Sequence, residues 1–321
     1  MSDNSCFIKK IIIRKVRHLS NLEIQISDTE KKHLILTGKN ASGKTSVLEA
    51  IKDYLAGIEN QQISNIPGLK NNIEQFKNNI TQWEKSLPTI AESQKFAIQN
   101  NINAFKTQIK AFQATIDRFE TIVSLEFSNL SVLSSDYEKG AFIFSYFDAK
   151  RNLNLTPPRG ITKFNLNPKY LITDRVGLSF IQYIVNLYAD RSFARESNDM
   201  QAVSEIVGWF ENFQNSLREI FNDQNLKIEF DRVNYNFNIL MSDHEKTDLN
   251  HLSDGYSSIL SIITELILRM EGKDLKAYDL QGIVLIDELE THLHIELQKQ
   301  IFPFLTKFFP NIQFIITTHS P

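Results

Sequence analysis

The sequence GKNASGKT, residues 38–45, follows a strand expected at 33–36 and precedes a helix expected over 44–56. It fits the pattern G-x-x-x-x-G-K-[ST] in the strand–loop–helix context that this pattern requires. Gly38 and Gly43 allow the backbone to turn its N–H groups toward a phosphate, and the helix N-terminus adds a favourable dipole end. The segment therefore predicts an α/β fold with a phosphate-binding loop.

Two side chains of this loop have separate expected roles. Lys44 supplies a point charge for the β- and γ-phosphate oxygens of ATP, and the Thr45 hydroxyl ligates Mg²⁺. A glycine turn before a helix with an exposed lysine is the alternative, and the surrounding strand and helix count against it. The residues of this segment expected to contact the nucleotide are Gly38, Lys39, Asn40, Ala41, Ser42, Gly43, Lys44, Thr45 and Ser46.

A second stretch, GIVLIDE at 282–288, has apolar residues followed by two acidic ones. A buried strand that ends in acids is common by itself, but downstream of a phosphate-binding loop this pattern is typical of a Walker B motif. Asp287 is then expected to hold Mg²⁺, and Glu288 to orient and deprotonate the attacking water. The predicted cofactors are ATP and Mg²⁺.

Two further patterns are weak when taken alone. LSDGYSS at 252–258 opens an expected helix, where Ser253 or Asp254 could be a simple N-cap. FIITTHSP at 314–321 is an apolar strand that ends at His319, which could be a polar strand end. Their order after the phosphate-binding loop and around GIVLIDE favours a functional role for both.

The clearest periodic pattern lies on either side of Pro88. Apolar residues recur there at alternating intervals of four and three, which predicts two heptad helices in an antiparallel coiled-coil hairpin. Two amphipathic helices lying on a globular body are the alternative, and the narrow apolar stripe favours a protruding hairpin. The stripe consists of Leu69, Ile73, Phe76, Ile80, Trp83 and Leu87, and then Ile98, Ile102, Phe105, Ile109, Phe112, Ile116, Phe119 and Val123.

These patterns divide the chain into four expected segments. Residues 1–65 form an ATPase N-lobe with the phosphate-binding loop, and residues 66–123 form the hairpin insertion. Residues 124–240 form a mixed strand and helical lobe, with a helical region over 178–221 that is broken by polar residues. Residues 241–321 form an ATPase C-lobe with the other three motifs.

The composition excludes several classes of protein. The net charge of −3 means that a nucleic-acid partner would have to meet a local basic patch. The single cysteine, Cys6, excludes a disulfide framework within the chain and fits a reducing cytoplasm. The start MSDNSCFIKK has no apolar leader, and no run of 18 apolar residues follows, so we expect a cytoplasmic protein without a membrane span.

The order of loop, hairpin, LSDGYSS, Walker B and final histidine resembles the SMC/RecF/OLD branch of the ABC-type ATPases. The resemblance implies a P-loop NTPase fold, an ABC ATPase head with a hairpin insertion and a helical lobe. LSDGYSS is similar to the family signature Leu-Ser-Gly-Gly-Gln, with Asp254 and Tyr256 as departures. The resemblance implies that Ser253 and the Gly255 N–H contact the γ-phosphate of ATP held by a second subunit, and that His319 senses this phosphate.

Two further parts of the family pattern concern residues near the nucleotide. In that branch an arginine after the first strand reaches the nucleotide phosphates, and Arg17 is the best match here, with Arg14 nearby. No segment matches the family's Gln-loop. SYFDAKRN at 145–152 stands in its place, where Lys150 and Arg151 would face the nucleotide or DNA.

The segment DELETHLHIELQ at 287–298 resembles the Glu-x-His-Leu-His run of OLD-like and bacterial-defence ATPases. Transporter subunits carry a Ser-Ala-Leu-Asp D-loop instead, which argues against a transporter. Glu290, His292 and His294 have the ligand types of a metal site, but the resemblance places them at a dimer interface.

The resemblance thus implies a nucleotide-driven dimerisation switch with Lys44, Glu288 and His319 as catalytic residues. We interpret it as the ATPase component of an anti-phage defence complex that controls a nuclease or other effector, fused or separate. The expected partners are a second copy in an ATP sandwich, forming a homodimer or higher homo-oligomer, and an effector protein or C-terminal nuclease. Double-stranded DNA is a further candidate partner, which would meet Lys9, Lys10, Arg14, Lys15 and Arg17. A solvated strand face is the alternative for these five residues.

Two alternatives remain at this point. The chain could be a RecF/SMC-like DNA repair ATPase, or a slowly hydrolysing oligomeric scaffold that sequesters an effector protein. Glu288 argues against a scaffold that has lost hydrolysis.

Overall fold

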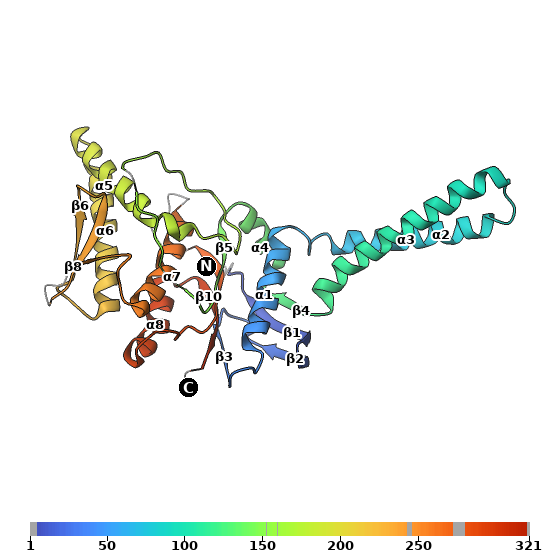
Figure 1. Ribbon diagram of the computed structural model, residues 1–321, viewed down its shortest axis with the longest axis horizontal. Helices are drawn as coiled ribbons and strands as arrows, with labels where there is room; N and C mark the ends of the chain where they lie inside the picture. The colour runs from blue at the N-terminus through green and yellow to red at the C-terminus, as the bar shows by residue number, and fades with distance from the viewer. Residues whose placement is uncertain (1–4, 152, 159, 243–245, 272–279, 320–321) are drawn as a thin grey trace.

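The computed structural model describes residues 5–151, 153–158, 160–242, 246–271 and 280–319. Figure 1 shows a body built around several sheets, with a pair of long helices extending from one end and a smaller helical lobe at the other. None of the helices in these ranges has the length and apolar character needed to cross a membrane.

A four-stranded parallel sheet forms the centre of the body. Its order is β3 (Leu34–Thr37), β10 (Ile312–Thr318), β9 (Gln281–Ile286) and β5 (Phe142–Phe147). The last three strands are almost continuously apolar and buried, as expected for parallel strands covered on both faces. Since all four strands are parallel, their carboxyl ends meet at one edge of the sheet.

Helices cover both faces of this sheet. Along β9, Ile283 and Leu285 join one apolar core with α1 (Lys44–Glu59), while Val284 and Ile286 join a second core. The second core contains α7 (Asp254–Glu271) and α8 (Ile295–Phe308). This alternation follows from the two-residue period of a strand and produces three layers.

A three-stranded antiparallel sheet lies beside the α1 layer, in the order β2 (Leu19–Gln25), β1 (Ile8–Val16) and β4 (Val123–Phe127). The Gln313 side chain connects it to the central sheet, because its amide accepts from Ile8 N at 2.7 Å and donates to Ile8 O at 3.0 Å. The segment that we expected to be one lobe, 124–240, therefore contributes β4 and β5 to the sheets of the body.

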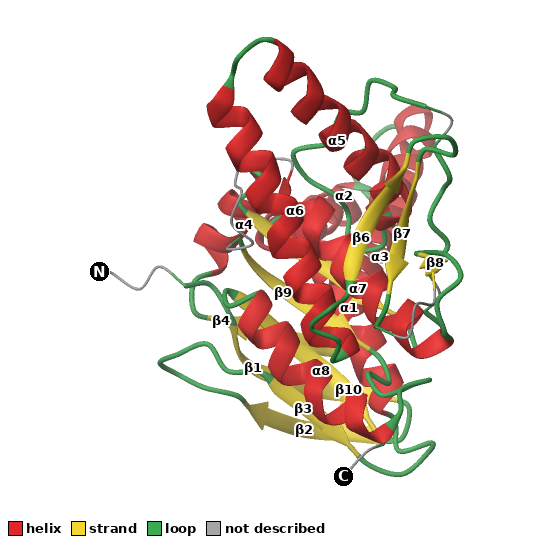
Figure 2. Cartoon of the chain, turned by 90° about the vertical axis from the view of Figure 1, so that its left-hand side faces the viewer, coloured by secondary structure: helices red, strands yellow, loops and turns green. Residues whose placement is uncertain are grey.

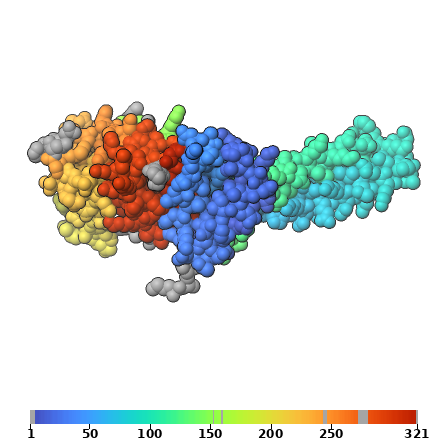
Figure 3. All heavy atoms as spheres, turned by 90° about the horizontal axis from the view of Figure 1, so that it is seen from below, coloured from blue at the N-terminus to red at the C-terminus, as the bar shows by residue number. Residues whose placement is uncertain are grey.

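The extending helices are α2 (Ile66–Ser86) and α3 (Glu92–Glu120), which run antiparallel between α1 and β4. Phe76 stacks on Phe105 with ring centroids 4.3 Å apart, and Lys106 pairs with Glu84 at 3.0 Å. All residues of the apolar stripe are buried or half-buried. Figure 3 shows that the two helices project beyond the body.

The lobe at the opposite end follows a short α4 (Leu130–Glu138), β5 and a 3-10 turn η1 (Val176–Ser179). It consists of α5 (Phe180–Glu196), α6 (Met200–Phe221) and an antiparallel sheet, with the two helices side by side (Figure 2). The polar break expected in this helical region is present between α5 and α6. The sheet strands are β6 (Lys227–Asp231), β7 (Asn236–Leu240) and β8 (Lys246–Asp248).

Candidate functional site

The phosphate-binding loop has the backbone that its glycines allow. Gly38 and Gly43 have φ angles of 152° and 94°, and Ala41 between them has a φ of 62°. The Lys44 ammonium bends back over the loop and donates to the carbonyls of Gly38 at 2.7 Å and Lys39 at 3.1 Å. The Lys44 ammonium therefore lies above the loop at the N-terminus of α1, an arrangement suited to binding an anion.

Asp287 follows β9 and is buried beneath this loop. Its Oδ1 accepts from the Thr45 hydroxyl at 3.1 Å and from the Thr317 hydroxyl at 2.6 Å. The neighbouring strand ends thus bring together two motifs that are 242 residues apart in sequence. Thr317 was not identified from the sequence, since a threonine near a strand end has no distinctive local signal.

Glu288 is the next residue and has a φ of 46°, in the left-handed region that few non-glycine residues adopt. Its backbone N–H donates to the Thr317 hydroxyl at 2.7 Å, and its Oε1 lies 3.4 Å from His319 Nε2. His319 Nδ1 lies 3.3 Å from Lys44 Nζ and 3.1 Å from Gly38 O. The structure therefore places the three expected catalytic residues side by side.

The expected signature segment opens α7, and its Ser253 is exposed. A Cβ added at Gly255 would lie 2.9 Å from the His292 carbonyl oxygen, so the start of α7 rests closely on the loop after Walker B. Tyr256, a departure from the family pattern, stacks on Phe221 at 4.0 Å with the rings nearly parallel. This contact connects the signature segment to the end of α6 in the helical lobe.

Arg17 lies in the turn between β1 and β2, exposed and with a φ of 51°. It lines a cavity of about 280 Å³ together with Ser46 of α1. The same turn brings Leu19 and the His18 ring to the loop, since a Cβ at Gly43 would lie 3.1 Å and 3.5 Å from them. His18 is a further candidate that the sequence did not suggest.

The loop after Walker B contains Glu290, His292 and His294. The Glu290 carboxylate accepts from the His319 backbone N–H, while His292 and His294 are exposed. Within the described part of the chain, no group of three or more His, Cys, Asp and Glu side chains is arranged to hold a metal ion. Glu290 thus supports the strand end that carries His319 within the same chain.

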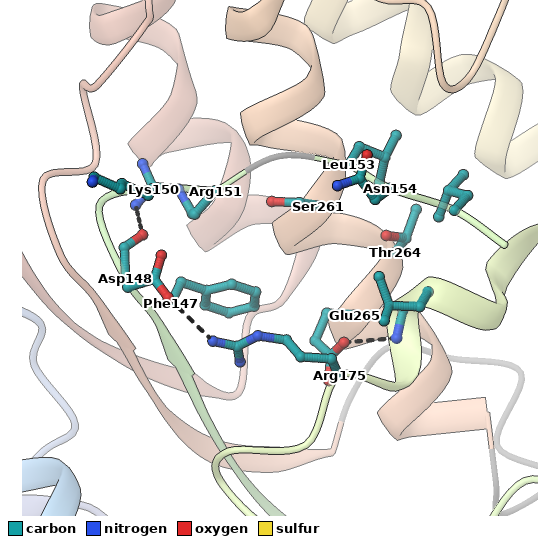
Figure 4. A pocket seen from close by; sticks show the side chains of 13 residues that line it. Phe147, Asp148, Lys150, Arg151, Leu153, Asn154, Arg175, Ser261, Thr264 and Glu265 are labelled. Atoms are coloured by element: carbon teal, nitrogen blue, oxygen red, sulfur yellow. Dashed lines mark hydrogen bonds and ion pairs between the residues drawn. The ribbon is translucent and has the colours of Figure 1, made fainter.

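Arg151, which we expected to face the nucleotide or DNA, instead points toward the backbone of residues 287–289. Its side chain is buried and donates to the carbonyls of Asp287, Glu288 and Leu289, because the chain after β5 passes behind the Walker B turn. Burial lowers the pKa of its guanidinium to about 10. Arg151 also lines a cavity of about 100 Å³ beside α7, shown in Figure 4.

The donor groups of the site fit MgATP. Thr45 Oγ1 and Asp287 Oδ1 lie 3.1 Å apart, close to the spacing of roughly 2.9 Å between neighbouring ligands of an octahedral Mg²⁺. Ser42 Oγ in the loop is buried with no hydrogen-bond partner among the described residues. Thr45 and Asp287 could therefore hold Mg²⁺, while the loop amides and Lys44 could hold phosphates.

Comparison with known proteins identifies several relatives. The Septu protein PtuA of Bacillus mycoides (strain KBAB4) is 25% identical over 321 residues, which covers 98% of this chain and 38% of that protein. The "Retron Ec83 probable ATPase" of Escherichia coli is 47% identical over 73 residues, covering 22% of this chain and 14% of that protein. The chain thus spans well under half the length of either relative.

Among solved structures, the SmcHead bound to the C-winged helix domain of ScpA aligns over 98% of this chain and 90% of that one, with 12% identity and a TM-score of 0.43. A family model covers most of the chain and all four motifs. The family it represents is described as "AAA domain, putative AbiEii toxin, Type IV TA system", the match spans residues 34–321, and the chain therefore belongs to this family.

Proposed function

We propose that this chain binds and hydrolyses ATP as a nucleotide-driven dimerisation switch, and that it is the ATPase component of an anti-phage defence complex. The observation that carries the proposal is the meeting of Lys44, Thr45, Asp287, Glu288 and His319 at the carboxyl edge of one parallel sheet. Ligands of open α/β sheets bind at this edge.

In the proposed hydrolysis each of these residues has a separate role. The loop amides and Lys44 bind the phosphates, and Thr45 and Asp287 hold Mg²⁺, which neutralises charge on the phosphate oxygens when bound. Glu288 orients the attacking water and accepts its proton. His319, which lies between Lys44 and Glu288, donates a hydrogen bond to the γ-phosphate in this proposal.

Dimerisation is supported by the exposed Ser253 at the start of α7. Two chains would close head-to-tail, so that Ser253 and the Gly255 N–H of one contact the γ-phosphate held by the other. Arg17 is proposed to contact phosphates within its own chain. The α2–α3 pair is proposed to be a coiled-coil arm that transmits opening of the dimer to a partner.

The relatives support a role in defence, since the matched proteins are Septu and retron components. The effector, a nuclease or another protein, is proposed to be controlled through this dimer. A DNA-repair role has less support. Lys9 and Lys10 pair with acidic side chains, so fewer free charges remain for DNA.

The proposal is tested by phosphate release and equilibrium MgATP binding on wild type, Lys44→Ala and Glu288→Gln. We expect Lys44→Ala to lose binding, and Glu288→Gln to bind ATP within about threefold of wild type while turnover falls about 100-fold or more. Unchanged turnover in Glu288→Gln would show that Glu288 is not the base. Tight ATP binding with negligible turnover in wild type would favour the scaffold.

A further inference from the structure

Arg151 uses every hydrogen-bond donor that an arginine has. Its side chain is 5% exposed, in the segment that follows β5. A guanidinium carries five N–H groups in a fixed fork. The five acceptors are Asp148 O at 2.9 Å, Ser258 Oγ at 3.1 Å, and the carbonyl oxygens of Asp287, Glu288 and Leu289, the last two at 2.9 and 3.3 Å.

Three of these acceptors are consecutive carbonyls in the turn that carries Glu288. Three carbonyl oxygens that point to one place repel one another unless a cation lies between them, and the left-handed φ of 46° at Glu288 adds strain. Thr317 holds the same turn from the other side, where its hydroxyl accepts from Glu288 N. Arg151 and Thr317 together therefore hold the backbone from which the Glu288 side chain projects.

The bond from Arg151 Nε to the Ser258 hydroxyl connects this turn to α7, the helix that the signature segment opens. Ser258 is buried in the second turn of α7, which begins at Asp254. The adjacent Ser257 hydroxyl accepts from Leu153 N at 2.8 Å, so the segment around Arg151 is attached to α7 twice. A shift of the start of α7 would therefore move Arg151, and with it the carbonyls of the Glu288 turn.

We propose that Arg151 is a positioning residue that couples the signature helix to the catalytic base. Engagement of the start of α7 by a second subunit would be transmitted through Ser258 and Arg151 to the Glu288 turn, so that water activation follows dimer closure. The proposal rests on the proposed function for the role of Glu288. It assigns Arg151 no contact with the nucleotide.

Arg269, which lies on α7 together with Ser258, offers a matched control for Arg151. It is also buried, pairs with Glu265 at 2.7 Å, and donates to three backbone carbonyls at 2.8 to 3.0 Å. Those carbonyls belong to Phe144, Leu171 and Asp174, away from the Walker B turn. Arg151→Lys and Arg269→Lys thus impose similar losses of hydrogen bonds, and only the first touches the Glu288 turn.

The experiment first measures the unfolding temperature of the full chain and of each variant. The Kd for MgATP and kcat are then measured below those temperatures. We expect Arg151→Lys to lower kcat by about 10- to 100-fold with the Kd within about threefold, since a small misplacement of a catalytic group has this effect. Arg269→Lys is expected to lower the unfolding temperature but to keep kcat within about threefold. Equal loss of kcat in both variants, or a Kd that rises as much as kcat falls in Arg151→Lys, would overturn the proposal.

A second measurement does not require hydrolysis. Amide hydrogen exchange of wild type, Arg151→Lys and Ser258→Ala compares residues 287–293, the start of α7 and the phosphate-binding loop. Faster exchange of the first two regions together, with an unchanged loop, supports the coupling even if wild type hydrolyses no ATP. If exchange becomes faster only at residues 287–293 in both variants, and α7 is unaffected, Arg151 supports the Glu288 turn locally and does not couple it to α7.

Discussion

A single hydroxyl, that of Thr317, lies between the two acidic residues of the Walker B motif. It donates to Asp287 Oδ1 and accepts from Glu288 N, and the side chain is fully buried. Asp287 and Glu288 are expected to do different tasks, one with the metal and one with water. The hydroxyl therefore connects the Asp287 carboxylate to the backbone of Glu288.

Replacing Thr317 by valine keeps the shape of the side chain and removes both hydrogen bonds. We expect the free energy of unfolding to fall by about 1–3 kcal/mol and ATP turnover to fall by about tenfold or more. Denaturant unfolding and phosphate release measure the two effects. Thr317→Ser retains the hydroxyl and is expected to keep most activity; equal activity of the valine and serine variants would contradict this role.

Glu59, at the end of α1, predicts a pH dependence of stability. Burial raises the pKa of its carboxyl to about 7, although hydrogen bonds from Tyr137 and Ile172 N oppose this. The folded state thus binds a proton more tightly than the unfolded chain, whose pKa is 4.5. This contribution is present in full below 4.5 and is lost as pH rises to about 7, at most about 3 kcal/mol.

The measurement is denaturant unfolding between pH 4.5 and pH 7 for wild type and Glu59→Gln. Wild type should lose stability relative to the glutamine variant as pH rises. Parallel pH profiles for the two proteins would show that Glu59 titrates normally in the folded state.

At the scale of elements, the α2–α3 pair has its own small core. Phe105 lies 4.3 Å from Phe76 and 5.1 Å from Trp83, measured between ring centroids. Charged pairs such as Lys70–Glu120 flank the seam, and exposed pairs of this kind add little stability. The apolar seam, which combines these rings with the buried Ile80 and Ile102, therefore carries the association of the two helices.

Phe105→Ala should destabilise the pair of helices by about 1–3 kcal/mol, a modest loss because the ring is only half-buried. MgATP binding should be unchanged. Limited proteolysis is expected to cut faster between residues 80 and 100. Phe96, which is 76% exposed, is the control, and Phe96→Ala should behave like wild type. A matching change in MgATP affinity for Phe105→Ala would show that the helices are not independent of the site.

At the scale of the whole molecule, the helix pair and the helical lobe lie at opposite ends, with the candidate site in the body between them (Figure 1). Both ends connect to the site through short routes. The helix pair follows α1, which begins at the phosphate-binding loop, and the lobe meets α7 through the Phe221–Tyr256 stack. Changes at the nucleotide could therefore reach both ends.

Light scattering with and without MgATP tests the assembly. Glu288→Gln should double its mass when ATP is added, because bound ATP persists, and a second substitution, Ser253→Arg, should prevent this by blocking the contact surface. Lys44→Ala is the control without nucleotide binding and should not change mass. An oligomer of the same size with and without ATP would argue against a nucleotide-driven switch.

Features that depend on local spacing could be predicted from the order of the residues alone. The glycine pattern at 38–45, the apolar run before Asp287 and the heptads around Pro88 are each visible within a few turns of chain. The contacts of Arg151, which bonds to carbonyls about 136 residues away, and those of Thr317 are visible only in the folded chain. Such contacts depend on how the strands order in the sheet, and backbone carbonyls leave no trace in the side-chain pattern.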